Sequence, residues 1–192
     1  MRLELTAFTR RGAALAARLA EELTRRGHQA ACTRGAGESA ADWTAQAFGR
    51  AQGLIFVGAA GIAVRSIAPH LRHKSTDPAV VVVDERGQFA IPILSGHLGG
   101  ANDLAREIAA LLGGQAVITT ATDVNGAFAV DQWARAQGLA VCNPEKIVNV
   151  SSALLEGKTI SFWSRWLIAG ERPAGVLDGE RETADVVVDW YR

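Results

Sequence analysis

The chain has 192 residues, 48% of them hydrophobic, which is enough to bury the core of one large domain or of a domain with a small addition. Its 20 basic and 20 acidic residues cancel, which argues against nucleic acid or an anionic membrane as the main partner. The first residues contain no apolar signal core and no stretch reaches membrane-spanning length, so we expect a cytoplasmic protein. Cys32 and Cys142 are isolated, a pattern that predicts neither a disulfide nor a zinc site.

Strand-like and helix-like runs alternate along most of the chain. The clearest strand is Ala79–Val83, and the turn Asp84–Gly87 joins it to a strand over 88–93 in a predicted hairpin. The other predicted strands are short apolar or alternating runs, at residues 3–8, 28–32, 54–57, 116–118 and 139–141. The predicted helices carry apolar residues at helical spacing, at residues 13–23, 40–48, 62–71, 104–112, 128–136 and from 143 onward. This alternation predicts a three-layer α/β fold with a mostly parallel sheet and helices on both of its faces.

The pattern changes after Gly157. Lys158–Trp163 and Asp185–Trp190 look like strands, separated by a stretch that contains Pro and Gly. Two strands rarely form a stable sheet by themselves, so this part looks incomplete. We therefore predict an N-terminal α/β domain over residues 1–142 and a small C-terminal α/β appendage over residues 143–192.

The segment Leu94–Asp103 is the most informative part of the sequence. It places Ser95, His97 and two further polar side chains among three glycines, between a predicted strand and a predicted helix. Such junctions lie at a sheet edge, where α/β proteins bind ligands, and glycine lets the backbone approach the ligand closely. We interpret His97 as a catalytic or ligand-contacting residue. The alternative is that His97 binds a carbonyl group while Ser95 caps the following helix.

Two further strand exits carry small or polar residues. Gly58–Ile62 follows a buried run and opens a helix, which favours an anionic ligand group, although the same residues suit an ordinary tight turn. Thr119–Asn125 follows another predicted strand, and within it Asp123 either caps a helix or orients His97. We expect the three exits to meet at one rim of the sheet.

Residues 43–76 contain no Asp or Glu. A locally cationic region on a neutral chain points to an acidic small molecule as ligand. For Arg72 and His73 we favour the simpler interpretation that they complement the carboxyl end of a helix, whereas Arg65 and Lys74 are candidate ligand clamps. The cations of this stretch are Arg50, Arg65, Arg72 and Lys74.

Four segments together resemble the N-terminal region of the cobalamin-biosynthesis family CbiG. They are Gly58–Arg65, Asp77–Asp84, Leu94–Asn102 and Thr119–Asp123, and they occur in this order. The tail from Asn143 resembles the central region of the same family. The resemblance implies a cobalt-precorrin-5A hydrolase of anaerobic cobalamin (vitamin B12) biosynthesis. In that reaction water opens the ring-A lactone of a tetrapyrrole macrocycle, and a two-carbon unit leaves as acetaldehyde.

This reaction needs an activated water, a group that stabilises the oxyanion, and proton transfer. We expect His97 as the general base on water or as a proton shuttle, Ser95 as an oxyanion donor, and Asp123 as a residue that orients substrate or His97. The other expected substrate-binding residues are Gly58, Gly61, Arg65, Lys74, Gly99, Gly100, Asn102 and Thr120. Cobalt is carried within the substrate, so we expect no cofactor and no protein-bound metal.

The family usually carries a further C-terminal domain, and this chain ends at Arg192 before one could form. We therefore expect that a partner would be a separate C-terminal domain protein or a second copy of the chain. An alternative function is a non-catalytic module that binds a corrinoid or a nucleotide for such a partner. A third is a generic serine hydrolase at Ser95, although the Gly-x-Ser-x-Gly elbow is absent.

Overall fold

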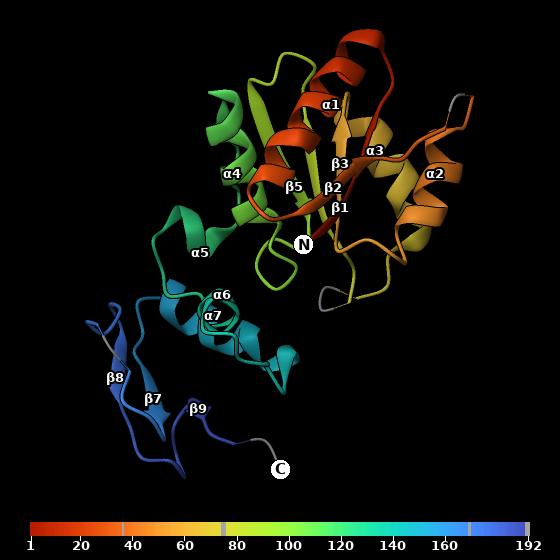
Figure 1. Cartoon of the computed structure of the whole chain (residues 1–192). Helices are drawn as coiled ribbons and strands as arrows, with labels where there is room; N and C mark the ends of the chain where they lie inside the picture. Colours follow the sequence, from red (N-terminus) through yellow and green to blue (C-terminus); the bar gives the residue numbers. More distant parts are fainter. Residues whose placement is uncertain (36, 74–75, 169, 191–192) are drawn as a thin grey trace. The chain divides into compact units, whose positions relative to one another are not determined.

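The chain forms two compact units, Met1–Ile118 and Thr119–Arg192 (Figure 1). Both combine helices with a sheet, as the sequence predicts, so the α/β class and the small C-terminal appendage are confirmed. The structure is a computed structural model, which describes residues 1–35, 37–73, 76–168 and 170–190.

The boundary between the units lies earlier in the chain than the predicted one at residues 142–143. The reason is that the two short helices α5 (Ala121–Val124) and α6 (Val130–Ala136) pack against α7 (Ile147–Leu155) in the second unit. The strand-like pattern that begins after Gly157 therefore marks the start of the second sheet rather than the start of the second unit.

The first unit is built on a six-strand sheet with the order β2-β1-β3-β4-β5-β6. Neighbouring strands from β2 to β4 are parallel, β5 is antiparallel to β4, and β6 is parallel to β5. The hairpin predicted for β4 and β5 is confirmed. The strands are β1 (Arg2–Ala7), β2 (Gln29–Cys32), β3 (Gly53–Val57), β4 (Ala79–Val83), β5 (Phe89–Leu94) and β6 (Gln115–Ala116).

Helices cover both faces of this sheet, which gives the predicted three layers (Figure 1). α1 (Arg10–Arg25) and α4 (Ala101–Leu112) pack on one face, and α2 (Ala40–Ala47) and α3 (Ala60–Ile67) on the other. All residues of β3 and β4 are buried, because a central strand between two helical layers needs apolar side chains on both faces. No helix in the described ranges has the length and apolarity of a membrane span.

One buried carboxylate, paired with an exposed arginine, interrupts the apolar interior of the first unit. Glu4 lies on β1 between two leucines and is only 6% exposed. Its carboxylate accepts two hydrogen bonds from Arg50, at 2.6 and 2.7 Å, and one from the Thr33 hydroxyl at 2.8 Å. The Trp43 indole donates in turn to Thr33 at 2.8 Å. This network ties β1 to α2 and to the segments that flank β2 and β3.

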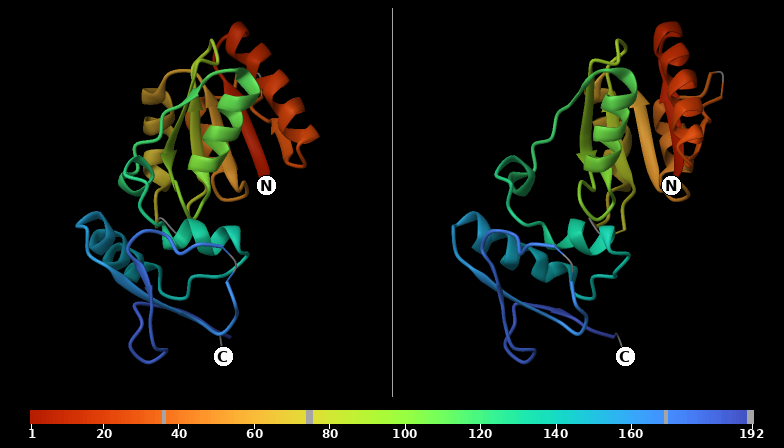
Figure 2. Two further views of the ribbon diagram at one scale, coloured as in Figure 1. Left: turned by 90° about the vertical axis from the view of Figure 1, so that its left-hand side faces the viewer. Right: turned by 60° about the vertical axis from the view of Figure 1, so that its left-hand side comes forward.

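The second unit has a small sheet of three parallel strands, in the order β8-β7-β9, with α6 and α7 along it (Figure 2). Trp133 of α6 packs edge-on against Phe162 at 5.4 Å between ring centroids. The strands are β7 (Ile160–Ser164), β8 (Val176–Asp178) and β9 (Val186–Val188), and a 3-10 turn (Pro144–Lys146) precedes α7.

Two predictions for the second unit were wrong. The stretch between the two predicted strands contains a third strand, β8, which completes the sheet. Residues 139–141 form no strand, because this apolar triplet has no neighbouring strand with which to pair.

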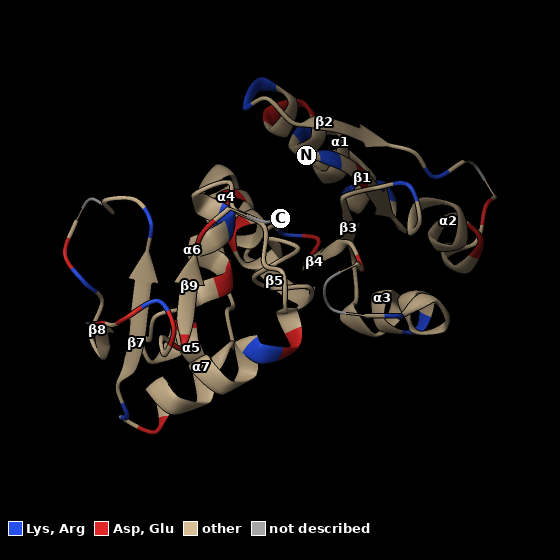
Figure 3. Cartoon of the chain, turned by 90° about the horizontal axis from the view of Figure 1, so that it is seen from below, with Lys and Arg blue, Asp and Glu red and all other residues tan. Residues whose placement is uncertain are grey.

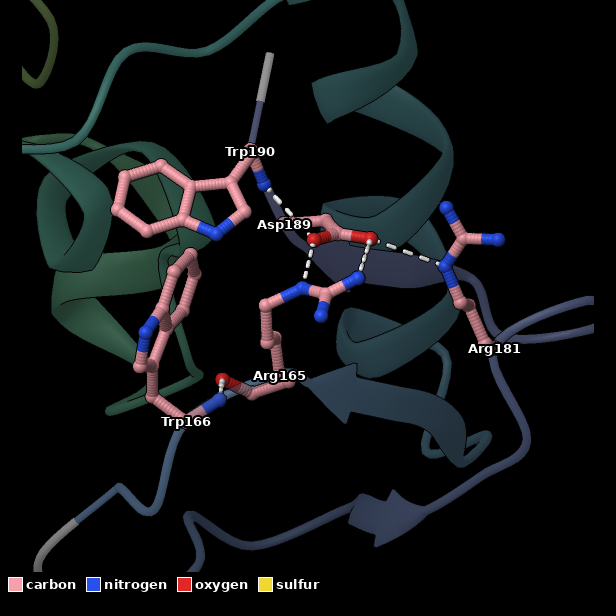
Figure 4. A network of polar contacts seen from close by, with 6 residues as sticks. Arg165, Trp166, Arg181, Asp189 and Trp190 are labelled. Atoms are coloured by element: carbon pink, nitrogen blue, oxygen red, sulfur yellow. Dashed lines mark hydrogen bonds and ion pairs between the residues drawn. The ribbon is translucent and has the colours of Figure 1, made fainter. Parts of the chain in front are cut away.

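An ion-pair network joins the ends of β7 and β9 (Figure 4). The Asp189 carboxylate accepts hydrogen bonds from Arg165 and, at 3.0 Å, from Arg181. The bond from Arg165, followed by one from the Trp190 amide, lowers the pKa of Asp189 well below its usual range. Trp190 also stacks edge-on against Trp166, with centroids 4.9 Å apart. These contacts hold together the ends of two strands that are short on their own.

The Glu4–Arg50 pair makes the stability of the first unit dependent on pH. Hydrogen bonding to Arg50 holds the pKa of Glu4 below its ordinary value, so the stabilisation is present above the pKa of the unfolded chain, about 4.3. It is lost as the pH falls through the lower, folded pKa. We expect Glu4→Gln to lower Tm by several degrees at pH 7 and to lower it much less near pH 3.

Thermal unfolding followed by circular dichroism at both pH values checks this. Glu21→Gln on α1 is the matched control, because the Glu21 side chain is 69% exposed. Equal losses of Tm at both pH values in Glu4→Gln would contradict the assignment.

Candidate functional site

The direction of β5 places the Ser95 turn at the edge of the sheet where β4 begins. Leu94 pairs with Val80, at the start of β4, and Ala90 pairs with Val83, at its end. Val83 in turn pairs with Val57, at the end of β3. We call the edge where β3 and β4 begin the amino edge, and the opposite one the carboxyl edge. The turn that follows β5 therefore lies at the amino edge.

Residues Ser95–Gly100 form a closed turn that leads into α4. The amide of Gly100 donates to the carbonyl of His97 at 2.9 Å, and the amide of Asn102 donates to that of Gly96 at 3.0 Å. The Ala101 amide also donates to the Ser95 carbonyl, at 3.1 Å. His97 lies at the middle of this turn and is half-buried. The hydrogen bonds of the turn hold the backbone on both sides of it.

The turn requires glycine for steric reasons at two positions. A Cβ at Gly99 would lie 2.4 Å from the Cβ of Ser95, and one at Gly96 would lie 2.8 Å from the Asn102 side-chain oxygen. Asn102 itself is 2% exposed and lies in the first turn of α4. The glycines of this motif thus allow the turn to close around His97.

Asp77 connects this turn to the loop that precedes β4. The Ser95 hydroxyl donates to the Asp77 backbone carbonyl at 2.9 Å. The Asp77 carboxylate, which is buried, accepts the Arg72 amide at 3.0 and 3.2 Å from its two oxygens. The Asp77 amide donates to the His73 carbonyl at 3.0 Å. The sequence analysis missed this role, although an acidic residue just before a wholly apolar strand-like run is a signal for it.

The basic loop of residues 71–73 lies at the same amino edge, since it leads into β4. α3 starts at the carboxyl edge and runs back toward this loop, so Arg65, in its last turn, is also near the amino edge. The side chains of Arg65, Arg72 and His73 are exposed. Figure 3 shows a blue segment and no red one on α3. The arrangement offers positive charge to an acidic ligand.

The four basic residues that we grouped from the sequence do not act together. Arg50 is taken by Glu4, as described above. Lys74 lies outside the described residues. Of these four residues, Arg65 and Arg72 are thus the ones that the structure shows as accessible to an acidic ligand.

The expectation of one common rim was wrong for Gly58 and Gly61. They follow β3 at the carboxyl edge, where the Gly58 amide donates to the Val83 carbonyl at 2.9 Å. The length of β3 separates that edge from the amino edge by about 13 Å. The fold itself gives the reason: β5 runs against β3 and β4, so its exit is at the other edge.

Thr120 and Asp123 belong to the second unit, at the start of α5. The candidate site described above is built within the first unit alone. It unites His97, Ser95, Gly99, Gly100 and Asn102 with Asp77 and the basic loop. Among the described residues, no group of three or more His, Cys, Asp or Glu side chains could hold a metal ion.

This arrangement can do two things chemically. A half-buried imidazole can take a proton from water, and exposed arginines can bind carboxylates. The Ser95 hydroxyl donates its hydrogen bond to the Asp77 carbonyl and not to His97, so Ser95 and His97 do not form a nucleophile–base pair in this structure.

Comparison with known proteins adds the family. Residues 42–123 match the family described as Cobalamin synthesis G N-terminal, and residues 128–189 match the one described as Cobalamin biosynthesis central region. Among solved structures, a cobalamin biosynthesis protein G homolog from Sulfolobus solfataricus shares the fold, with a TM-score of 0.61 and 23% identity. That match covers 97% of this chain and 58% of the other.

Two curated relatives are named cobalt-precorrin-5A hydrolase. The one from Salmonella typhimurium is 48% identical over 119 residues, which are 62% of this chain and 34% of the relative. The one from Priestia megaterium is 44% identical over 110 residues, which are 57% of this chain and 29% of the relative. The matches thus span about a third of the curated relatives. The chain belongs to the CbiG family of cobalamin biosynthesis proteins, whose N-terminal and central regions it carries.

Proposed function

We propose that the chain acts in cobalt-precorrin-5A hydrolysis, opening the ring-A lactone of the macrocycle with release of acetaldehyde. The observation that carries this proposal is that the His97 turn and the basic loop meet at one edge of the sheet, joined through Ser95 and Asp77. The names of the curated relatives support it. The substrate is a tetrapyrrole with several carboxylates, which suits exposed arginines beside a histidine.

The proposed chemistry uses His97 alternately as base and as acid. His97 takes a proton from water as the water oxygen adds to the lactone carbonyl carbon, and the imidazolium gives this proton to the ring oxygen, which leaves as an alcohol. His97 then takes the alcohol proton as the adjacent carbon–carbon bond breaks and acetaldehyde leaves, and it returns that proton to the macrocycle carbon. The Gly99 amide is the proposed donor to the oxyanion, since the Gly100 amide already donates to the His97 carbonyl. Asn102, Thr120 and Asp123 remain candidates for orienting the substrate.

Replacing His97 tests the central role. We expect His97→Gln to lower kcat by about 10²- to 10⁴-fold, the usual contribution of a general base, with a small change in KM. The measurement is acetaldehyde release from cobalt-precorrin-5A, followed with alcohol dehydrogenase and NADH. The assay is run with and without the separately expressed C-terminal domain of a CbiG relative.

His28→Gln is the matched control, because His28 contacts the N-terminus and Glu107 at the start of β2, four strands away from β5. It is expected to keep full activity. Wild-type protein that binds the macrocycle tightly but releases no acetaldehyde under either condition would favour the non-catalytic binding module instead.

Arg72 of the basic loop and Arg65 of α3 are expected to bind substrate carboxylates. The double variant Arg65→Gln/Arg72→Gln should raise KM about tenfold at low salt and leave kcat nearly unchanged, and added salt should narrow this difference.

Initial rates at several substrate and salt concentrations measure both effects. The control removes the same charge at the carboxyl edge, in the variant Arg10→Gln/Arg11→Gln, since both arginines are exposed in the first turn of α1. If the two double variants change KM equally, Arg65 and Arg72 are not the binding site.

A further inference from the structure

The hydrogen bond between Ser95 and Asp77 joins two loops that lie 18 residues apart in the sequence. We propose that these two residues position His97. Their bond, which we call the Ser95–Asp77 clasp, fixes the His97 turn beside the basic loop. This inference rests on the proposed function, in which His97 acts on water.

The backbone of Ser95 is the first observation. Its φ of 56° makes it the single non-glycine residue with positive φ among the described residues. An L-residue adopts this conformation at a cost, and such strain persists only where the surroundings hold it. Two bonds hold Ser95: its hydroxyl donates to Asp77, and its carbonyl accepts the Ala101 amide.

The rigidity of Asp77 is the second observation. Its carboxylate accepts the Arg72 amide, its own amide donates to the His73 carbonyl, and the residue is 8% exposed. Two residues later the chain enters β4, whose five residues are all buried. The Asp77 carbonyl is therefore a well-held acceptor, and the clasp ties the polar turn to the start of the buried strand β4.

The clasp also determines what the Ser95 hydroxyl can do. Its proton is directed at a carbonyl oxygen, so it serves neither His97 nor a developing oxyanion. In place of the catalytic role predicted from the sequence, the geometry gives Ser95 a positioning role. The oxyanion donor of the proposed reaction is then the Gly99 amide, because the Gly100 amide donates to the His97 carbonyl.

The test compares Ser95→Ala and Ser95→Gly with Asp77→Asn. The two Ser95 variants remove the hydroxyl, and Ser95→Gly also relieves the positive φ. Asp77→Asn keeps the backbone carbonyl that Ser95 needs and changes only the group that holds Arg72. Amide hydrogen exchange and the His97 ring signal are measured by NMR on the full chain without substrate.

We expect both Ser95 variants to speed exchange at Gly100, Ala101 and Asn102 about five- to tenfold, as loss of one hydrogen bond would, and to broaden the His97 ring signal. Asp77→Asn should speed exchange at Arg72 and change the turn less than about twofold. Unchanged exchange at the turn in Ser95→Ala overturns the proposal. Slower amide exchange of the turn in Ser95→Gly than in wild type also overturns it, because backbone strain at Ser95, and not its hydroxyl, would then determine the stability of the turn.

Kinetics separate positioning from direct catalysis. With the clasp as a positioning device, Ser95→Ala lowers kcat about 10- to 100-fold with little change in KM, and the exchange changes accompany the loss. A loss of about 10²- to 10³-fold with the turn unchanged would instead make Ser95 an oxyanion donor and overturn the proposal. If wild-type protein releases no acetaldehyde, the proposed function fails, while the exchange data still decide whether the clasp positions His97.

Discussion

The reversal of chain direction between β4 and β5 is the constraint on which the candidate site depends. The four-residue turn Asp84–Gly87 is too short for a crossover, so β5 must run back along β4. That reversal carries the Ser95 turn to the point where β4 starts, and there it meets the loop that leads into β4. A parallel β5 would have delivered the same residues to the glycines that follow β3, at the other edge.

Charge is distributed unevenly in the first unit. Burial of Glu4 explains why Arg50 is paired while other arginines of the same stretch are exposed. The only acid on β1, Glu4, needs a cation because an unpaired buried carboxylate is costly. Arg50 meets that need, and the remaining arginines of the acid-free stretch stay at the surface of the amino edge. A neutral chain thereby presents local positive charge without an acidic residue in the same stretch to cancel it.

Much of the fold could be predicted from the sequence, because the buried strands are nearly pure apolar runs. The run Ala79–Val83 and the turn after it gave both the strand and the hairpin. Because the strands of a hairpin are antiparallel, the hairpin also implies that β5 ends at the opposite edge from Gly58. The expectation of one rim did not take this into account. β8 could not be predicted, since three residues beside Gly175 are too few to show alternation.

The site could be predicted only in part, for physical reasons. Glycines around a histidine mark a closed turn, and the structure has one. The contact between Ser95 and Asp77 depends on strand direction and on the position of a backbone carbonyl, and neither leaves a trace in residue types. For the same reason the sequence could not show that Arg50 pairs with the buried carboxylate of Glu4.

The outermost strands of both sheets are short. β2 has four residues and β6 has two, while β8 and β9 have three each. Unpaired amide and carbonyl groups along an edge strand can pair with strands of other molecules, and a short edge strand has few such groups. The chain thereby limits uncontrolled aggregation, and engineering that lengthens any of these four segments would weaken that protection.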